Sequence, residues 1–104
     1  MNKRVRISKS TSEKIIKIQN SFLNEKGFKV TRSSIVNKSI LEAFNGKDTF
    51  INSKTYVDWS IQTSFILEEK TVEIISKIKE YYKVKTGKSI SLAQIINISI
   101  SKLK

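Results

Sequence analysis

The sequence contains no cysteine and no histidine. Their absence excludes disulfide frameworks, zinc sites built from these two residues, and acid–base or nucleophilic catalysis by histidine. Long apolar runs are also missing, because the longest one is Phe65, Ile66 and Leu67. A membrane helix needs about 20 consecutive apolar residues. We therefore expect no membrane span and no secretion signal, and a cytoplasmic protein.

Charge is strongly unbalanced along the chain. Twenty lysines and arginines oppose nine aspartates and glutamates in 104 residues, which gives a formal net charge of +11. Residues 1–44 hold ten basic and three acidic side chains, residues 60–104 hold eight and four, and the segment between them is neutral. Such an excess repels itself in a folded chain, so nucleic acid is the expected partner. A basic surface that is only solvated is the alternative.

The chain repeats itself at an offset of 60 residues without a gap. Apolar positions, glycines and capping residues recur together, as duplication of one structural unit requires. The matched positions are Glu13, Ile15, Lys17, Ile18, Phe22, Gly27, Val30, Thr31, Ile35, Val36, Asn37, Ser39 and Ile40 in the first half, and Glu73, Ile75, Lys77, Ile78, Tyr82, Gly87, Ile90, Ser91, Ile95, Ile96, Asn97, Ser99 and Ile100 in the second. We therefore divide the chain into a first unit at 1–45, a connector at 46–60 and a second unit at 61–104.

Each unit begins with a predicted strand, at residues 3–8 and 61–67. Apolar and polar side chains alternate in the first of these with the period of two that a strand requires. One face of this strand then carries Val5 and Ile7, and the other carries Arg4, Arg6 and Ser8.

Two predicted helices follow the strand of the first unit. Ser10 to Glu13 matches a capping box, whose hydroxyl and carboxylate bond the free amides at a helix start. Gly27 ends that helix, because glycine accepts the left-handed conformation after the last turn. Thr31 caps the next helix, and Asn45-Gly46 ends it.

The second unit repeats this order. It contains a helix at about 69–86, then Gly87, the cap Ser91 and a helix that continues toward the C-terminus. Residues 96–100 alternate like a strand, and their β-branched side chains favour strands. We interpret them as helix, because the matching residues of the first unit have helical spacing.

The connector between the units is rich in large apolar side chains. They are Phe50, Ile51, Tyr56, Val57 and Trp59. We expect the connector to pack against the units and to contain a helical turn. Stacking of Trp59 on a base is the alternative, and packing is the favoured interpretation.

A single strand followed by two helices leaves its edges unpaired. Two units can pair their strands and pack the helices beneath, which predicts a mainly α fold with a short two-stranded antiparallel ribbon. The predicted inward side chains are Val5, Ile7, Phe65 and Leu67, and the outward ones are Arg4, Arg6, Ser8, Gln62, Ser64 and Ile66. Such a ribbon fits the major groove of DNA, where arginine, glutamine and serine can address base edges.

The order of strand, capped helix, glycine and capped helix resembles the ribbon-helix-helix family (the MetJ/Arc/CopG superfamily), over residues 3–44 and 61–103. Family members usually form two-fold dimers with one strand from each chain, so the resemblance implies two ribbon-helix-helix units fused as a pseudo-dimer. It implies base contacts by Arg4, Arg6, Ser8, Gln62 and Ser64. It also implies phosphate contacts by Thr31, Arg32, Ser33 and Ser91 at the starts of the second helices, whose free amides attract anions. We expect further phosphate contacts by the basic residues Lys9, Lys29 and Lys88.

The second unit departs from the family pattern. Its strand has no basic residue, and Ile66 lies on the face that meets DNA in the family. Leu92 and Ala93 stand where the first unit has Arg32 and Ser33. Either the two halves of a DNA site are read unequally, or the second strand mainly provides architecture.

The predicted function is sequence-specific binding of double-stranded DNA, as a transcriptional repressor of a plasmid, phage or other mobile element. The resemblance implies one close alternative, a relaxosome accessory protein that marks a plasmid's origin of transfer. The partners are then double-stranded DNA, further copies of the chain on adjacent sites and, in the alternative role, a relaxase.

Alternatives of other classes are a protein-interaction adaptor with incidental DNA binding, and an RNA-binding protein. Arg4 and Arg6 on one polar strand face argue against the adaptor. The predicted strand faces lack the exposed aromatic residues that stack on single-stranded RNA. No carboxylate pair, activated nucleophile or phosphate-binding glycine loop stands out, so we expect no catalysis, no cofactor and no metal site.

Overall fold

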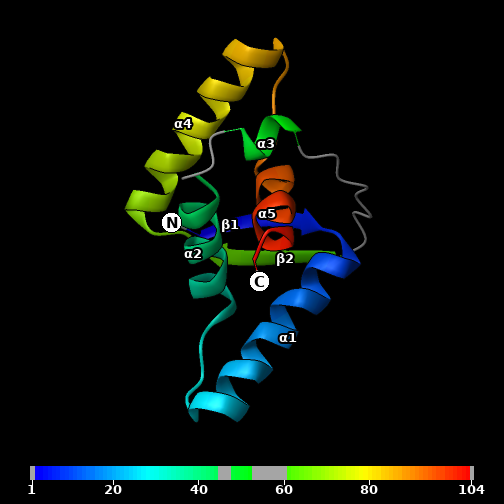
Figure 1. Ribbon diagram of the computed structural model, residues 1–104, viewed down its shortest axis with the longest axis vertical. Coiled ribbons are helices and arrows are strands. Elements are labelled where there is room, and N and C mark those ends of the chain that lie inside the picture. Colours follow the sequence, from blue (N-terminus) through cyan, green and yellow to red (C-terminus); the bar gives the residue numbers. More distant parts are fainter. Residues whose placement is uncertain (1, 45–47, 53–60, 104) are drawn as a thin grey trace.

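The computed structural model describes residues 2–44, 48–52 and 61–103. These residues form a mainly helical structure with a short two-stranded antiparallel ribbon, as the sequence predicted. Along the chain the elements are β1 (Asn2–Ile7), α1 (Lys9–Lys26), α2 (Arg32–Phe44), α3 (Thr49–Asn52), β2 (Ile61–Ile66), α4 (Glu69–Thr86) and α5 (Leu92–Ser101). The ribbon and α5 lie at the centre of the molecule, and α1 and α4 extend to its opposite ends (Figure 1).

The two strands pair in a register that places their predicted inward side chains on the same face. Arg4 lies opposite Ser64 at the middle of the ribbon, and the strands run antiparallel. The side chains predicted to point inward are all buried: Val5, Ile7, Phe65 and Leu67. The predicted pairing and the predicted inward face are therefore confirmed.

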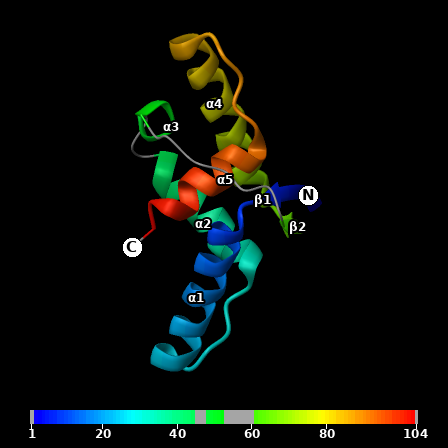
Figure 2. The same ribbon diagram turned by 90° about the vertical axis from the view of Figure 1, so that its right-hand side faces the viewer.

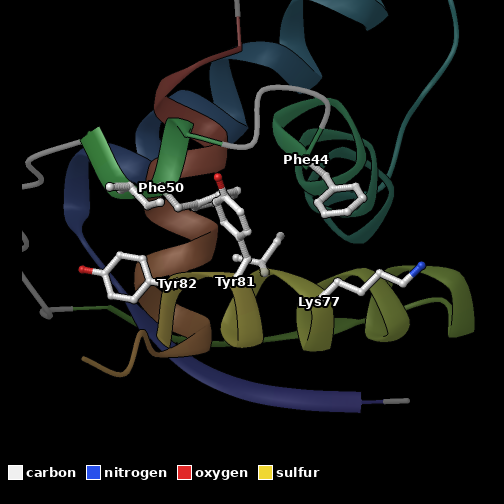
Figure 3. Close-up of a pocket in the computed structure, with 7 residues that line it drawn as sticks. Phe44, Phe50, Lys77, Tyr81 and Tyr82 are labelled. Carbon is white, nitrogen blue, oxygen red and sulfur yellow. The ribbon is translucent and has the colours of Figure 1, made fainter. Parts of the chain in front are cut away.

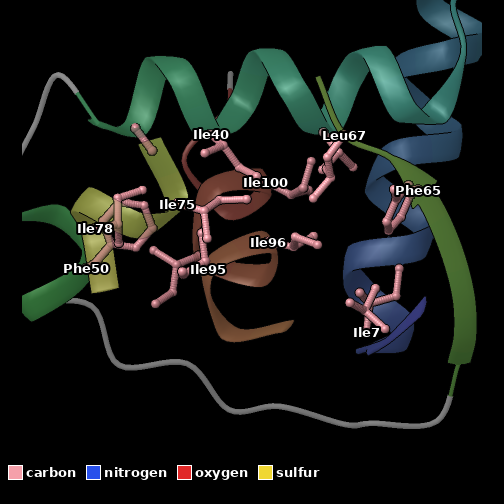
Figure 4. Close-up of a cluster of buried hydrophobic side chains, with 14 of the residues drawn as sticks. Ile7, Ile40, Phe50, Phe65, Leu67, Ile75, Ile78, Ile95, Ile96 and Ile100 are labelled. Atoms are coloured by element: carbon pink, nitrogen blue, oxygen red, sulfur yellow. The ribbon is translucent and has the colours of Figure 1, made fainter. Parts of the chain in front are cut away.

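The core lies between the ribbon and the helices, with α5 at its centre. Figure 4 shows Ile96 extending from α5 toward Ile7 and Phe65 of the ribbon, and Ile95 extending toward Ile75 of α4. All residues from 95 to 100 are buried. A helix that is covered on all sides does not need a polar stripe. This explains why the segment has a strand-like sequence, and the prediction that it is helical is confirmed.

The long helices α1 and α4 correspond to each other along the chain. Each spans 18 residues, and their first residues are Lys9 and Glu69. Each ends at a glycine in the left-handed conformation, with φ of 71° at Gly27 and 72° at Gly87. The glycines that the sequence predicted as helix ends are confirmed, and the 60-residue repeat extends to the bounds of these two helices.

The start of α1 differs from its prediction. The sequence predicted a capping box from Ser10 to Glu13, whereas α1 begins at Lys9 with Ser8 as its N-cap residue. The chain enters the helix directly from β1, and at this junction the backbone amide of Ser8 donates to Oδ1 of Asn97 at 3.2 Å. Ser10 consequently lies inside the first turn, and the predicted capping box is wrong.

The caps of the second helix in each unit are confirmed. The amide of Ser34 donates to the hydroxyl oxygen of Thr31 at 3.0 Å. The amide of Gln94 donates to the hydroxyl oxygen of Ser91 at 3.1 Å. Both hydroxyls thus satisfy a backbone donor in the first turn of the helix that follows them.

The helix α3 is the helical turn predicted within the connector. Phe50 is buried, and α3 packs against α4 and α5. It lies on the side of the molecule away from the ribbon (Figure 2). The predicted helix end at Asn45-Gly46 and the predicted burial of Tyr56, Val57 and Trp59 fall outside the described residues. Among the helices that are described, none is long and apolar enough to cross a membrane.

Candidate nucleic-acid interface

Four of the five predicted base-contacting side chains lie on the outward face of the ribbon. Arg4 and Arg6 of β1 and Gln62 and Ser64 of β2 are all exposed. Neither strand contains an acidic residue. This face therefore combines two guanidinium groups with an amide and a hydroxyl, and it has no carboxylate that would repel a phosphate.

The fifth predicted residue, Ser8, is not on this face. Its side chain is 3% exposed, its hydroxyl donates to Oδ1 of Asn97 at 3.1 Å, and it lies 2.8 Å from Oγ1 of Thr11. The alternation that predicted Ser8 beside Arg6 stops where β1 ends, at Ile7. The predicted outward placement of Ser8 is wrong, because the chain turns into α1 there and the side chain faces α5.

The register gives the outward face two chemically different ends. Arg6 lies opposite Gln62 at one end, and Asn2 lies opposite Ile66 at the other. Directly opposed side chains on one face of a ribbon lie about 4.5–5.5 Å apart at Cβ, so each pair forms one local patch. The sequence prediction missed Asn2, although Asn2 shares the alternating phase of Arg4 and Arg6.

The start of α2 lies against the end of β2. The hydroxyl oxygen of Ser33 accepts from the amide of Ile66 at 2.8 Å. Nδ2 of Asn37 donates to the carbonyl oxygen of Ile66 at 3.0 Å. Thr31, which caps the helix, and Arg32 are exposed. The positive end of the helix dipole and the Arg32 charge thus lie beside the ribbon, where they favour an anion.

The start of α5 is built differently. Ser91 and Gln94 form a reciprocal capping box, in which the Ser91 amide also donates to Oε1 of Gln94 at 3.0 Å. The two residues after Ser91 are half-buried and apolar, so this start lacks a counterpart of Arg32. Lys88, which precedes it, is exposed. The two helix starts therefore offer unequal surroundings to a phosphate.

The lysines of α1 and of the segment that follows it fall into two groups. Lys9 is exposed at the first position of α1, and Lys29 is exposed in the segment between α1 and α2. Lys14 is instead engaged, because its Nζ donates to the carbonyls of Ser101 at 3.1 Å and Leu103 at 2.6 Å. Burial is the main cause that lowers its pKa. Lys14 ties α1 to the end of α5, whereas Lys9 and Lys29 keep the exposure that their predicted phosphate contacts require.

An apolar pocket of about 160 Å³ lies between α2, α3 and α4 (Figure 3). It is lined by Phe44, Phe50, Ile51, Lys77, Ile78, Tyr81 and Tyr82. The hydroxyl of Tyr81 donates to Oδ1 of Asp48 at 2.9 Å, and this hydrogen bond is the main cause that raises the pKa of Tyr81. Because α3 lies away from the ribbon (Figure 2), this pocket is separate from the outward face.

The outward face can bind a planar, polar ligand. Each guanidinium offers five N–H donors in a fixed fork, and the amide of Gln62 offers both donors and an acceptor. Neither Arg4 nor Arg6 forms a salt bridge with a described residue, so their donors are open to a ligand. No protein-family model, curated protein or solved structure matches this chain.

Proposed function

We propose that this chain binds double-stranded DNA with the outward face of the ribbon in the major groove. The observation that carries the proposal is the grouping of Arg4, Arg6, Gln62 and Ser64 on one exposed face without an acidic residue. The major groove is about 12 Å wide and admits a two-stranded ribbon. In this groove arginine forms hydrogen bonds with guanine and glutamine with adenine, whereas serine can form hydrogen bonds with either base.

Phosphate contacts hold the ribbon in place in this proposal. The net charge of +11 attracts the DNA backbone without regard to sequence. The start of α2, with Thr31, Arg32 and Ser33, lies beside β2 and holds one phosphate next to the base contacts. The remaining proposed phosphate contacts are Lys9, Lys29, Lys88 and Ser91. Such contacts fix the register and orientation of the protein on the duplex, while the ribbon reads the sequence.

We further infer that the chain is a tandem ribbon-helix-helix protein, with its two units arranged as a pseudo-dimer. Oδ1 of Asn97 accepts from the amide of Ser8, and Oδ1 of Asn37 accepts from the amide of Glu68. Positions 8 and 68 correspond in the repeat, as do 37 and 97. A two-fold dimer makes each interface contact twice. This reciprocal pair of hydrogen bonds supports the interpretation of the halves as fused protomers.

The proposed role is transcriptional repression, in the cytoplasm, at a promoter of a plasmid, phage or other mobile element. In the alternative role, the same DNA-binding activity marks a plasmid's origin of transfer for a relaxase. Selecting the fragments of the source genome that the protein retains distinguishes the two roles. Fragments from promoters support repression, and fragments from an origin of transfer assign the accessory role.

Duplex binding measured at several salt concentrations tests the molecular proposal. We expect a log–log slope of about four to eight, because roughly that many phosphate contacts release counterions. Arg4→Ala should cost about 1–3 kcal/mol on a selected site. Lys83→Ala removes an equal charge from the exposed surface of α4 and should cost much less.

Two results contradict the proposal. One is the absence of binding to any genomic duplex, and the other is binding that does not change with salt. If the chain did not bind duplex DNA but bound a protein with an affinity independent of salt, the protein-interaction adaptor function would replace the proposed DNA binding.

A further inference from the structure

Ile66 is the apolar residue of the otherwise polar outward face. Its side chain is 64% exposed, whereas its neighbours Phe65 and Leu67 are 1% and 2% exposed. Single exposed apolar residues are common on protein surfaces and need no explanation by themselves. This one lies on the face that we propose for the major groove, two residues along β2 from Ser64.

The backbone of Ile66 is held from both sides by α2. Its amide donates to the hydroxyl oxygen of Ser33 at 2.8 Å, and its carbonyl accepts from Nδ2 of Asn37 at 3.0 Å. Because Phe65 and Leu67 are packed into the core, the alternation of the strand keeps the Ile66 side chain pointing outward. The aliphatic group is therefore presented in a fixed position rather than on a flexible loop.

The residue opposite Ile66 is Asn2, which is also exposed. In the major groove an asparagine amide can bond N6 and N7 of adenine, and an apolar side chain can contact the methyl group of thymine. The Asn2–Ile66 pair thus combines the two chemistries that an A·T base pair presents in this groove. The equivalent position in the first half is Arg6, whose preference is guanine.

We propose that Ile66 selects thymine through its 5-methyl group, with Asn2 addressing adenine at the same end of the ribbon. This inference rests on the proposed function, because it requires the outward face to enter the major groove. It makes Ile66 a specificity-determining residue and assigns an A·T preference to one end of the binding site.

The test removes the methyl group from DNA rather than the side chain from the protein. On a duplex selected by the wild-type protein, each thymine is replaced in turn by deoxyuridine, which pairs in the same way but lacks the methyl group. At one thymine we expect affinity to fall about fourfold, as for the loss of one buried methyl-sized group. At thymines away from this end of the ribbon no loss is expected.

Protein variants then assign the effect to Ile66. Ile66→Ala should bind the thymine and deoxyuridine duplexes with equal affinity, because the contact with the methyl group is gone. The matched control is Val84→Ala, which shortens another exposed aliphatic side chain, 75% exposed on α4. This control should keep the full preference for thymine. Circular dichroism of both variants shows that the fold is retained.

Each outcome decides one question. Loss of the thymine preference in Ile66→Ala alone supports the proposal. Salt-dependent duplex binding with no thymine preference, or a preference that Ile66→Ala retains, overturns this inference and leaves the proposed function in place. Unchanged DNA binding by Ile66→Ala together with lost self-association assigns Ile66 to a protein contact and also overturns the inference. Failure of the wild-type protein to bind any duplex overturns both.

Discussion

The side-chain oxygen of Asn97 accepts a hydrogen bond from the backbone amide of Ser8 at 3.2 Å, across 89 residues of sequence. The same contact occurs between Asn37 and the amide of Glu68 at 3.0 Å. In each case the second helix of one half holds the junction between strand and helix in the other half. The two halves are therefore connected through their polar groups as well as through the shared apolar core.

Asn97→Ala should destabilise the fold by about 1–3 kcal/mol, the cost of leaving a buried donor without its partner. Ser8 is 3% exposed, so water cannot easily replace the lost acceptor, and the hydroxyl of Thr11 loses the same oxygen. Urea-induced unfolding measures the change. Asn37→Ala should cost less, because Glu68 is exposed and water can bond its amide.

The matched control for both variants is Asn20→Ala, which removes an exposed asparagine from α1. Alanine favours the helix more than asparagine does, so this change should leave stability unchanged or slightly higher. Equal destabilisation by all three substitutions would show that the contacts between the halves contribute nothing particular.

Much of the fold could be predicted from the sequence because its determinants are local and repeated. Gly27 and Gly87 mark the ends of the long helices, and Thr31 and Ser91 mark the starts of the short ones. The alternation of polar and apolar side chains in β1 separated its inward face from its outward one. In the second unit Phe65 and Leu67 marked the inward face, although the residue between them, Ile66, is apolar and exposed. The strand-like residues 96–100 were assigned correctly through their counterparts in the first half.

The errors arose where contacts distant in sequence override a local pattern. Ser8 and Ser10 were both assigned by local rules, one by strand alternation and the other by a capping motif. The bond from Ser8 to Asn97 lies at the point where the strand ends and the helix begins. No local pattern contains that information. Asn2 was missed for a different reason, since its importance follows from its place opposite Ile66 in the register.

One chain supplies both strands of the ribbon, so the monomer should be the smallest folded unit. The unfolding temperature should then be independent of protein concentration, whereas dissociating subunits make it depend on concentration. Light scattering at low concentration and thermal unfolding at two concentrations measure this. A dimer that unfolds on dilution would show that strands are exchanged between chains. Assembly of several copies on adjacent DNA sites remains compatible with a monomer in solution.

Tyr81→Phe should weaken the packing of α3 against α4 in a manner that depends on pH. The hydrogen bond to Asp48 raises the pKa of Tyr81 above its ordinary value of 10.0. A group whose pKa is raised by folding contributes stability below its unfolded pKa and loses this contribution as the pH rises through the folded value. The wild type should therefore be slightly more stable than Tyr81→Phe at neutral pH, and the difference should vanish in strong base.

Urea unfolding of both proteins at neutral and strongly alkaline pH measures this difference. Tyr82→Phe leaves the bond between Tyr81 and Asp48 intact and controls for the loss of a hydroxyl from the same pocket. A difference between wild type and Tyr81→Phe that grows as the pH rises would rule out the assigned role of this hydrogen bond.

The DNA site should be non-palindromic, because the ribbon carries Arg6 with Gln62 at one end and Asn2 with Ile66 at the other. Arg6→Ala should cost about 1–3 kcal/mol of binding free energy and relax the guanine preference mainly at its own end.

Ser64→Ala should cost less binding free energy than Arg6→Ala, and Lys29→Ala should weaken the binding of all sequences about equally if Lys29 contacts phosphate alone. Asn2 and Arg6 lie about 13 Å apart along β1, so the two preferences should fall at different base pairs of the site. Binding-site selection with wild type and Arg6→Ala measures both effects, and a symmetric site whose halves relax equally would contradict this assignment of the ribbon ends.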